Sequence, residues 1–193
     1  YTYGYSISGD GTKFSLNGLA QIPDNGTVNF FMNNNPDKLY RLAEEHYADM
    51  KADGAEATMF FIHWGTEYQT TENATQNKMA QKLCDIGYDV IVGGHPHVIQ
   101  PAVWLEMKDS SGNVAKRTLC LCATGNFLSD SREKYTDSGV IFEFTIQEKA
   151  DLSGYTPYGK SGTTGYSFFI RTNTENSFAM SEAELGNMFT ITV

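Results

Sequence analysis

The stretch that decides the fold is DVIVGGHPHVIQP, residues 89–101 of the 193-residue chain. An apolar run ends in two glycines and is followed at once by two histidines that flank a proline. Such a run is typical of a strand that is covered on both faces of a sheet. The glycines let the chain turn sharply and approach a ligand closely. The proline favours extended backbone, so we expect both histidines on an extended segment.

A second apolar strand lies earlier in the chain, within EATMFFIHWG (residues 56–65), and ends at His63. Between the two strands, residues 74–86 carry apolar side chains at helical spacing, and Gly87 provides a C-terminal stop. A strand, a helix and a second strand in this order predict a parallel strand pair. The sequence therefore predicts an α/β fold.

The rest of the chain predicts one further helix and several strands. The helix begins after Asn35, an N-cap candidate, with Pro36 in its first turn, and Gly54 ends it. The other predicted elements are strands at 13–18, 27–32, 102–108, 116–125, 139–147, 166–172 and 188–193, a loop at 151–165 and a short helix at 181–185.

Composition excludes some functions. The formal net charge is -9 and no run of Lys or Arg is present, so nucleic-acid binding is not expected. The first residues, YTYGYSISGDG, have neither the basic nor the apolar region of a signal peptide, and we expect the chain to be part of something longer. Cys120 and Cys122 are expected to point to opposite faces of one strand, and Cys84 to be an inert helical thiol.

Three histidines stand at the ends of the two parallel strands. Ligands bind open α/β sheets at the carboxyl ends of their strands, so we expect His63, His95 and His97 to converge there. Imidazole is the commonest metal ligand near neutral pH and suits Zn, Fe, Ni and Cu, and Mn when carboxylates are near. The alternative is that each histidine is a hydrogen-bonded structural residue. His46, by contrast, is expected at the surface of the first helix.

Further polar side chains follow the strand ends. Glu67 and Tyr68 lie on the loop after His63. Glu67 is a candidate general acid or base or a binding group for an ammonium ion; the alternative is that it caps the next helix or faces water. Asn126 ends a later strand, where its amide either orients a substrate or holds a turn. No GxSxG nucleophile motif and no phosphate-cradling glycine loop are present.

Three segments carry a resemblance to a known family. HWGTEY, then QNKMAQKLCDIGYDVIVGGHPHVIQP, then ATGNF resemble the CapA/PgsA family of capsule and poly-γ-glutamate biosynthesis proteins, within the calcineurin-like metallophosphatase superfamily. The resemblance covers residues 1–147. The segment 94–97 is similar to the superfamily's Gly-His-x-His block, and Gly94 stands where many members carry another histidine. Thr124 replaces the leucine of the family's Leu-Gly-Asn-Phe.

The resemblance implies a fold and a function. It implies part of a four-layer α-β-β-α sandwich with a mixed sheet, in which residues 1–150 form the C-terminal half of the domain and 151–193 its loop and closing strands. It implies divalent metal ions (Mn, Fe or Zn), two in a complete domain, bound by His63, His95 and His97. Together with the positions of the polar residues after the strand ends, this leads us to expect that these histidines and Glu67 are catalytic and that Asn126 and Tyr68 contact an anionic polymer or phosphoester substrate.

The resemblance also implies that something is missing. The family's blocks that supply a bridging carboxylate and an amide ligand are not recognised here, so we expect this chain alone to be inactive. A second chain carrying the N-terminal half, or a homo-oligomer, is the expected partner. The parent protein would be extracellular or at the cell surface, anchored to the membrane. The alternative function is a non-enzymatic cell-surface module that binds polymer or another protein.

Overall fold

The structure is a computed structural model that describes residues 2–6, 13–16, 19–23, 28–32, 35–143 and 167–172. The predicted loop at 151–165, helix at 181–185 and strand at 188–193 lie outside these residues. The elements are β1 (Thr2–Ser6), β2 (Lys13–Leu16), β3 (Leu19–Pro23), β4 (Phe30–Met32), α1 (Asp37–Ala52), β5 (Met59–His63), α2 (Ala74–Ile86), β6 (Val90–Gly94), β7 (Ala102–Lys108), β8 (Val114–Leu121), β9 (Ser138–Glu143) and β10 (Ser167–Thr172).

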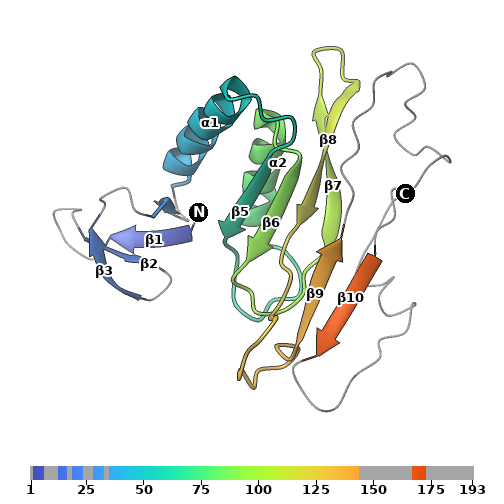
Figure 1. Cartoon of the computed structure of the whole chain (residues 1–193). Coiled ribbons are helices and arrows are strands. Elements are labelled where there is room, and N and C mark those ends of the chain that lie inside the picture. Colours follow the sequence, from blue (N-terminus) through green and yellow to red (C-terminus); the bar gives the residue numbers. More distant parts are fainter. Residues whose placement is uncertain are drawn as a thin grey trace.

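The main sheet is mixed. Its strand order is β3-β2-β1-β5-β6-β8-β7, with β4 paired to β1. The centre, β5-β6-β8, is parallel, whereas β7 runs antiparallel to β8. Strands β9 and β10 form a separate antiparallel pair. Figure 1 shows β1, β2 and β3 set to one side of the β5-β6 centre, and β9 and β10 beyond β7 and β8. The predicted α/β fold with a mixed sheet is confirmed.

The β5-α2-β6 unit forms as the sequence predicts. Strands β5 and β6 are parallel and in a register that places His63 opposite Gly94. Helix α2 spans the predicted residues 74–86. Asn73 caps its start in a reciprocal capping box with Gln76, and Gly87 ends it in the left-handed conformation at φ 118°. Local sequence signals therefore fix both ends of the helix that separates the two strands.

The helices cover one face of the sheet. Alternate residues of the central strands, including Phe60, Ile62 and Ile91, pack with Leu39 of α1 and Leu83 of α2 in the larger core. The opposite face has a smaller core around Ile99, Ala102, Leu119 and Leu121, against which Val140 and Phe142 of β9 pack. On that opposite face of β5, Met59 and Phe61 remain 37% and 60% exposed.

Three local expectations were wrong. Strands β1 and β3 were not anticipated, and α1 begins at Asp37 with Pro36 as its N-cap. Cys120 on β8 and Cys122 just after it point to the same face of the sheet, with their Sγ atoms 4.0 Å apart. This is expected of residues two apart on a strand, because side chains alternate between the faces. Cys84 is buried as expected, and burial raises the pKa of its thiol.

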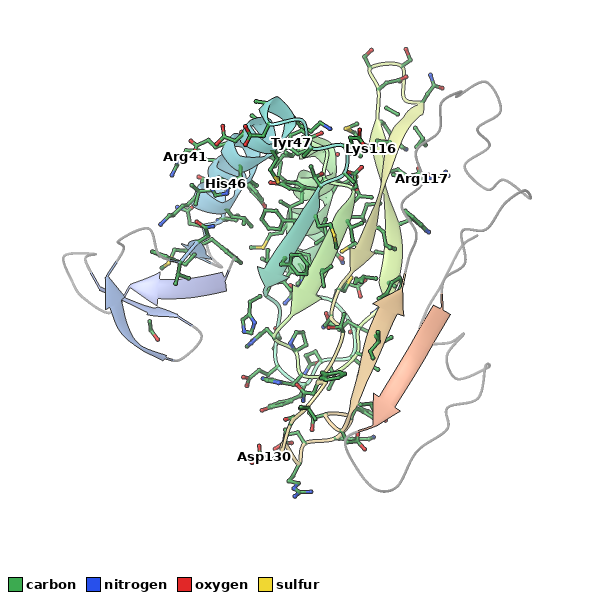
Figure 2. All side chains as sticks on the ribbon, in the orientation of Figure 1. Arg41, His46, Tyr47, Lys116, Arg117 and Asp130 are labelled. Atoms are coloured by element: carbon green, nitrogen blue, oxygen red, sulfur yellow. The ribbon has the colours of Figure 1, made fainter. Side chains whose placement is uncertain are left out.

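Asp89 ties three strands together at the start of β6. Its Oδ2 accepts hydrogen bonds from the backbone N and the Oγ1 of Thr58, at 2.8 and 2.9 Å. Its Oδ1 lies 2.8 Å from Lys116 Nζ on β8, and Figure 2 labels this lysine. Burial raises the pKa of Asp89, but the bonds from Lys116 and Thr58 outweigh it and hold the pKa below the ordinary value of 3.8.

We expect Asp89→Asn to cost about 1–2 kcal/mol of stability at pH 7, because hydrogen bonds to a charged group are lost or weakened. A carboxyl group with a depressed folded-state pKa stabilises above its unfolded value and loses that contribution as the pH falls through the folded value. The difference in free energy of unfolding between wild type and Asp89→Asn should therefore shrink as the pH falls from about 5 towards 3. Urea denaturation at several pH values measures it; a difference that stays constant would contradict the assignment.

Candidate functional site

The three histidine rings converge at the carboxyl ends of β5 and β6. His63 is the last residue of β5, and His95 directly follows β6. The ring centroids of His63 and His95 lie 4.7 Å apart, and those of His95 and His97 lie 6.3 Å apart. The predicted convergence is confirmed, and it follows from the parallel register that brings both strand ends to one edge.

The backbone of the histidine loop is strained. His95 has φ 101° and His97 has φ 60°, both in the region that favours glycine. The prediction of extended backbone around Pro96 is therefore wrong for both histidines. Tertiary bonds override the local preference: the backbone N of Trp64 donates to Gly94 O at 3.1 Å, and that of Tyr68 donates to Pro96 O at 2.8 Å. Strain of this kind clusters at functional sites.

Burial keeps two of the imidazoles neutral. It is the largest of the causes that lower the pKa of His63 from 6.5 to about 4, and the nearby His95 and His97 contribute to the same shift. Burial also lowers the pKa of His95; the Glu67 carboxylate opposes this and His97 adds to it. Both rings are therefore uncharged at pH 7, which is the form in which imidazole donates a lone pair to a metal.

Glu67 and Tyr68 lie beside the histidines. Both side chains are exposed, and the Glu67 carboxylate is near enough to act on the pKa of His95. The Tyr68 ring stacks on His97 with 6.1 Å between centroids and 28° between planes. The loop after β5 thus borders the imidazoles with one carboxylate and one aromatic ring.

Asn126 reaches the same place from the end of β8. Its Oδ1 lies 2.9 Å from His97 Nδ1, and its Nδ2 donates to the backbone oxygen of Thr136 at 2.9 Å. All six predicted site residues are accordingly brought to one edge of the sheet: His63, Glu67, Tyr68, His95, His97 and Asn126.

Sequence reasoning missed two buried glutamines behind this edge. Gln76 and Gln100 are each 2% exposed, and Gln76 Nε2 donates to Gln100 Oε1 at 2.8 Å. Gln100 Nε2 in turn donates to the backbone oxygens of Gln69 and Thr71, at 2.9 and 3.1 Å. Gln76 had a readable signal, since it occupies the capping-box position three residues after Asn73. Gln100 had none, because its partners lie more than twenty residues away.

The donor set fits a metal in type but is incomplete. Because a metal–imidazole bond is about 2.0–2.1 Å, the rings of His63 and His95, with centroids 4.7 Å apart, are close enough to share a metal. The 6.3 Å between the rings of His95 and His97 would place these two ligands almost opposite each other on one metal. Among the described residues, however, no group of three or more His, Cys, Asp or Glu side chains has its donor atoms arranged to hold a metal ion. A centre here would need further donors.

His46 stands apart from the other histidines. Figure 2 shows it on α1, away from the carboxyl ends of β5 and β6. It lines a groove of about 480 Å3 together with Asp49, Met59 and Phe61, among other residues of α1 and β5. None of the three convergent histidines lines this groove, so His46 provides a control for the others.

Comparisons with known proteins agree with the motifs. The family described as "Bacterial capsule synthesis protein PGA_cap" matches residues 2–131. "Capsule biosynthesis protein CapA" of Bacillus anthracis is 29% identical over 114 residues, 59% of this chain and 25% of that protein. "PGA biosynthesis protein CapA" of Bacillus subtilis (strain 168) is 30% identical over 86 residues, 45% of this chain and 20% of that protein.

These matches show which family the chain belongs to and how much of its relatives it spans. The aligned segments span only a quarter and a fifth of the two relatives. In the described part of the chain, neither helix has the length and apolar composition that crossing a bilayer requires. Because the family match extends over more than half of its residues, the chain belongs to the bacterial capsule synthesis protein PGA_cap family.

Proposed function

We propose that the chain provides part of a divalent-metal centre with phosphoesterase-type chemistry, in a protein that assembles a capsule or poly-γ-glutamate polymer. The observation that carries the proposal is the convergence of three imidazoles at one sheet edge, two of them held neutral by burial. Family membership and the names of both relatives support the biosynthetic context. The same context supports a location at the cell surface.

Each site residue has a role in this proposal. His63, His95 and His97 would hold the metal through ring nitrogens. Bound divalent cations, Mn, Fe or Zn, would supply Lewis acidity toward a phosphoester oxygen and toward water. Glu67, exposed beside His95, would move a proton to or from the reacting group. The Tyr68 ring on His97 would limit water access and offer a surface to substrate.

The proposal includes a partner. Three imidazoles without a carboxylate that bridges two metals leave a two-metal centre short of ligands. We propose that a further segment of a PGA_cap-type domain supplies them, from a second chain or from another part of the same protein. The exposed Met59 and Phe61 on β5 offer apolar surface for this segment. On the same face of the sheet, β9 already covers β8.

The first test is metal binding by this chain after removal of adventitious metal with a chelator. Titration calorimetry with Zn2+ or Mn2+ should detect binding that His63→Ala or His97→Ala weakens at least tenfold, the scale on which disturbing a metal's ligand environment acts. His46→Ala is the matched control and should bind as wild type does. The chain alone should hydrolyse generic phosphodiesters no faster than the metal ion does without protein.

Two outcomes would contradict the proposal. If wild type binds neither metal, or if His46→Ala weakens binding as much as His63→Ala does, the imidazoles do not form a metal centre. The chain would then be better described as a polymer-binding module. If the chain alone gives clear turnover that is lost in His97→Ala, the site is more complete than proposed.

A further inference from the structure

The amide of Asn126 determines which nitrogen of His97 carries the proton. The backbone oxygen of Thr136 can only accept a hydrogen bond, so the end of the amide that faces it, at 2.9 Å, must be the NH2 group. The other end, Oδ1, then faces His97 Nδ1 at 2.9 Å. Because this oxygen can only accept, Nδ1 must be the protonated nitrogen of the neutral ring, and Nε2 carries the lone pair.

The amide cannot easily turn around. The backbone N of Asn126 donates to Ser138 O at 3.2 Å, and a Cβ on Gly139 would overlap Asn126 O, so the two segments are in close contact. Thr136 is fully buried, and its Oγ1 donates to Glu133 O at 2.7 Å, which fixes the turn that presents its carbonyl. A flipped amide would set its oxygen against that carbonyl and lose the bond.

His97 is itself held on two sides. Tyr68 stacks on its ring, and the backbone N of Tyr68 donates to Pro96 O. The ring is thus fixed by the stack, by the strained backbone at φ 60° and by the bond from Nδ1. Free imidazole has two tautomers of similar energy, so a single bond of this kind is enough to select one.

We infer that Asn126 is a positioning residue: it selects the Nδ1–H tautomer of His97 and so leaves Nε2 as the nitrogen that is available to a divalent cation. The inference rests on the proposed function only for what Nε2 binds; the tautomer itself is independent of any metal. It gives Asn126 a role that acts through His97, in place of direct contact with a substrate.

The test is the tautomer of His97, read by long-range 1H–15N NMR on the metal-free protein under mildly alkaline conditions. In wild type, Nδ1 should show the chemical shift of a protonated nitrogen and Nε2 that of an unprotonated one. Asn126→Leu should move the ring toward the Nε2–H form. Asn126→Asp gives up the bond to Thr136 O but keeps an acceptor beside Nδ1, so the ring should stay in the Nδ1–H form.

A control separates positioning from a general disturbance of the loop. Thr136→Val loosens the turn by removing the bond from Oγ1 to Glu133, but it leaves the Asn126 oxygen as the group beside Nδ1, so the Nδ1–H tautomer should persist. A wild-type ring protonated at Nε2, or an Asn126→Leu ring with the wild-type pattern, would overturn the inference. The wild-type spectrum decides even if a variant fails to fold.

Zn2+ affinity measured by calorimetry on the same variants separates this inference from the proposed function. Asn126→Leu should bind Zn2+ at least tenfold more weakly than wild type, and Asn126→Asp should not. If the wild-type tautomer is Nδ1–H but no protein binds Zn2+, the tautomer assignment stands and the proposed metal centre fails. If Asn126→Leu changes the tautomer and binds Zn2+ as tightly as wild type, the positioning role is wrong.

Discussion

Gln100→Leu is expected to destabilise the fold by about 3 kcal/mol, although leucine fills a similar volume. The change removes three hydrogen bonds at a side chain that is 2% exposed. Gln76 Nε2 loses its acceptor, and the backbone oxygens of Gln69 and Thr71 lose their donor. Each buried polar group left without a partner costs about 1–3 kcal/mol. Chemical denaturation measures the change as a lower midpoint.

The same variant should loosen the loop that carries Glu67 and Tyr68. The Gln100 amide holds the far end of that loop, so its loss should raise hydrogen exchange at residues 66–72 more than in the central strands. Gln81→Leu is the matched control, because Gln81 is only half-buried and bonds to Asp85 and to the backbone of Glu106. It should cost under about 1 kcal/mol. Equal losses of stability in Gln100→Leu and Gln81→Leu would show that the buried glutamine hydrogen bonds contribute no more than exposed ones do.

Gly93→Ala is expected to destabilise the fold by about 3 kcal/mol or more, while Gly94→Ala, one residue on, changes stability by less than about 0.5 kcal/mol. A Cβ on Gly93 would overlap the backbone oxygen of Cys122 and the indole nitrogen of Trp64. Neither can move easily: the indole is fully buried, and its Nε1 donates to that same oxygen at 2.9 Å. Thermal or urea unfolding of the two variants measures the contrast.

Gly94 provides a strict control because a Cβ there meets nothing within 4 Å. Both glycines lie on β6, so strand propensity affects the two substitutions alike. A further readout is the histidine edge: Gly93→Ala should shift the NMR signals of His95 and His63, and Gly94→Ala should move them less. Two variants of equal stability would show that the sheet relaxes around residue 93 at little cost.

Much of the fold was predictable because its signals are local. The apolar runs before His63 and His95, the helical spacing of α2 and its capping residues each report on neighbours in sequence. Parallel pairing then follows from the strand–helix–strand order, and the convergence of the histidines follows from the pairing. The site was readable because chemistry and topology coincide at one sheet edge.

The remainder depended on contacts between distant residues. Glutamine is normally a surface residue, so nothing local indicates that Gln76 and Gln100 are buried against each other. The residue before a proline normally has extended backbone, but His95 has a positive φ angle. The hydrogen bond from the backbone N of Tyr68 to Pro96 O is one of the contacts that override this local preference. Strand β1 pairs with β5, far along the chain, as well as with β2. Strand β3 is a different case, because only Asn17 and Gly18 separate it from its antiparallel partner β2, and this dipeptide is a local hairpin signal.

The positive φ angles of His95 and His97 set backbone stability against the presence of two imidazoles in this loop. Each angle costs a non-glycine residue about 1–3 kcal/mol, a cost that glycine would not carry. In backbone terms alone, glycine would therefore suit both positions better, and it would leave a loop without imidazoles. The two histidines therefore cost the fold some stability. A variant of this chain that is engineered for stability should leave both residues unchanged.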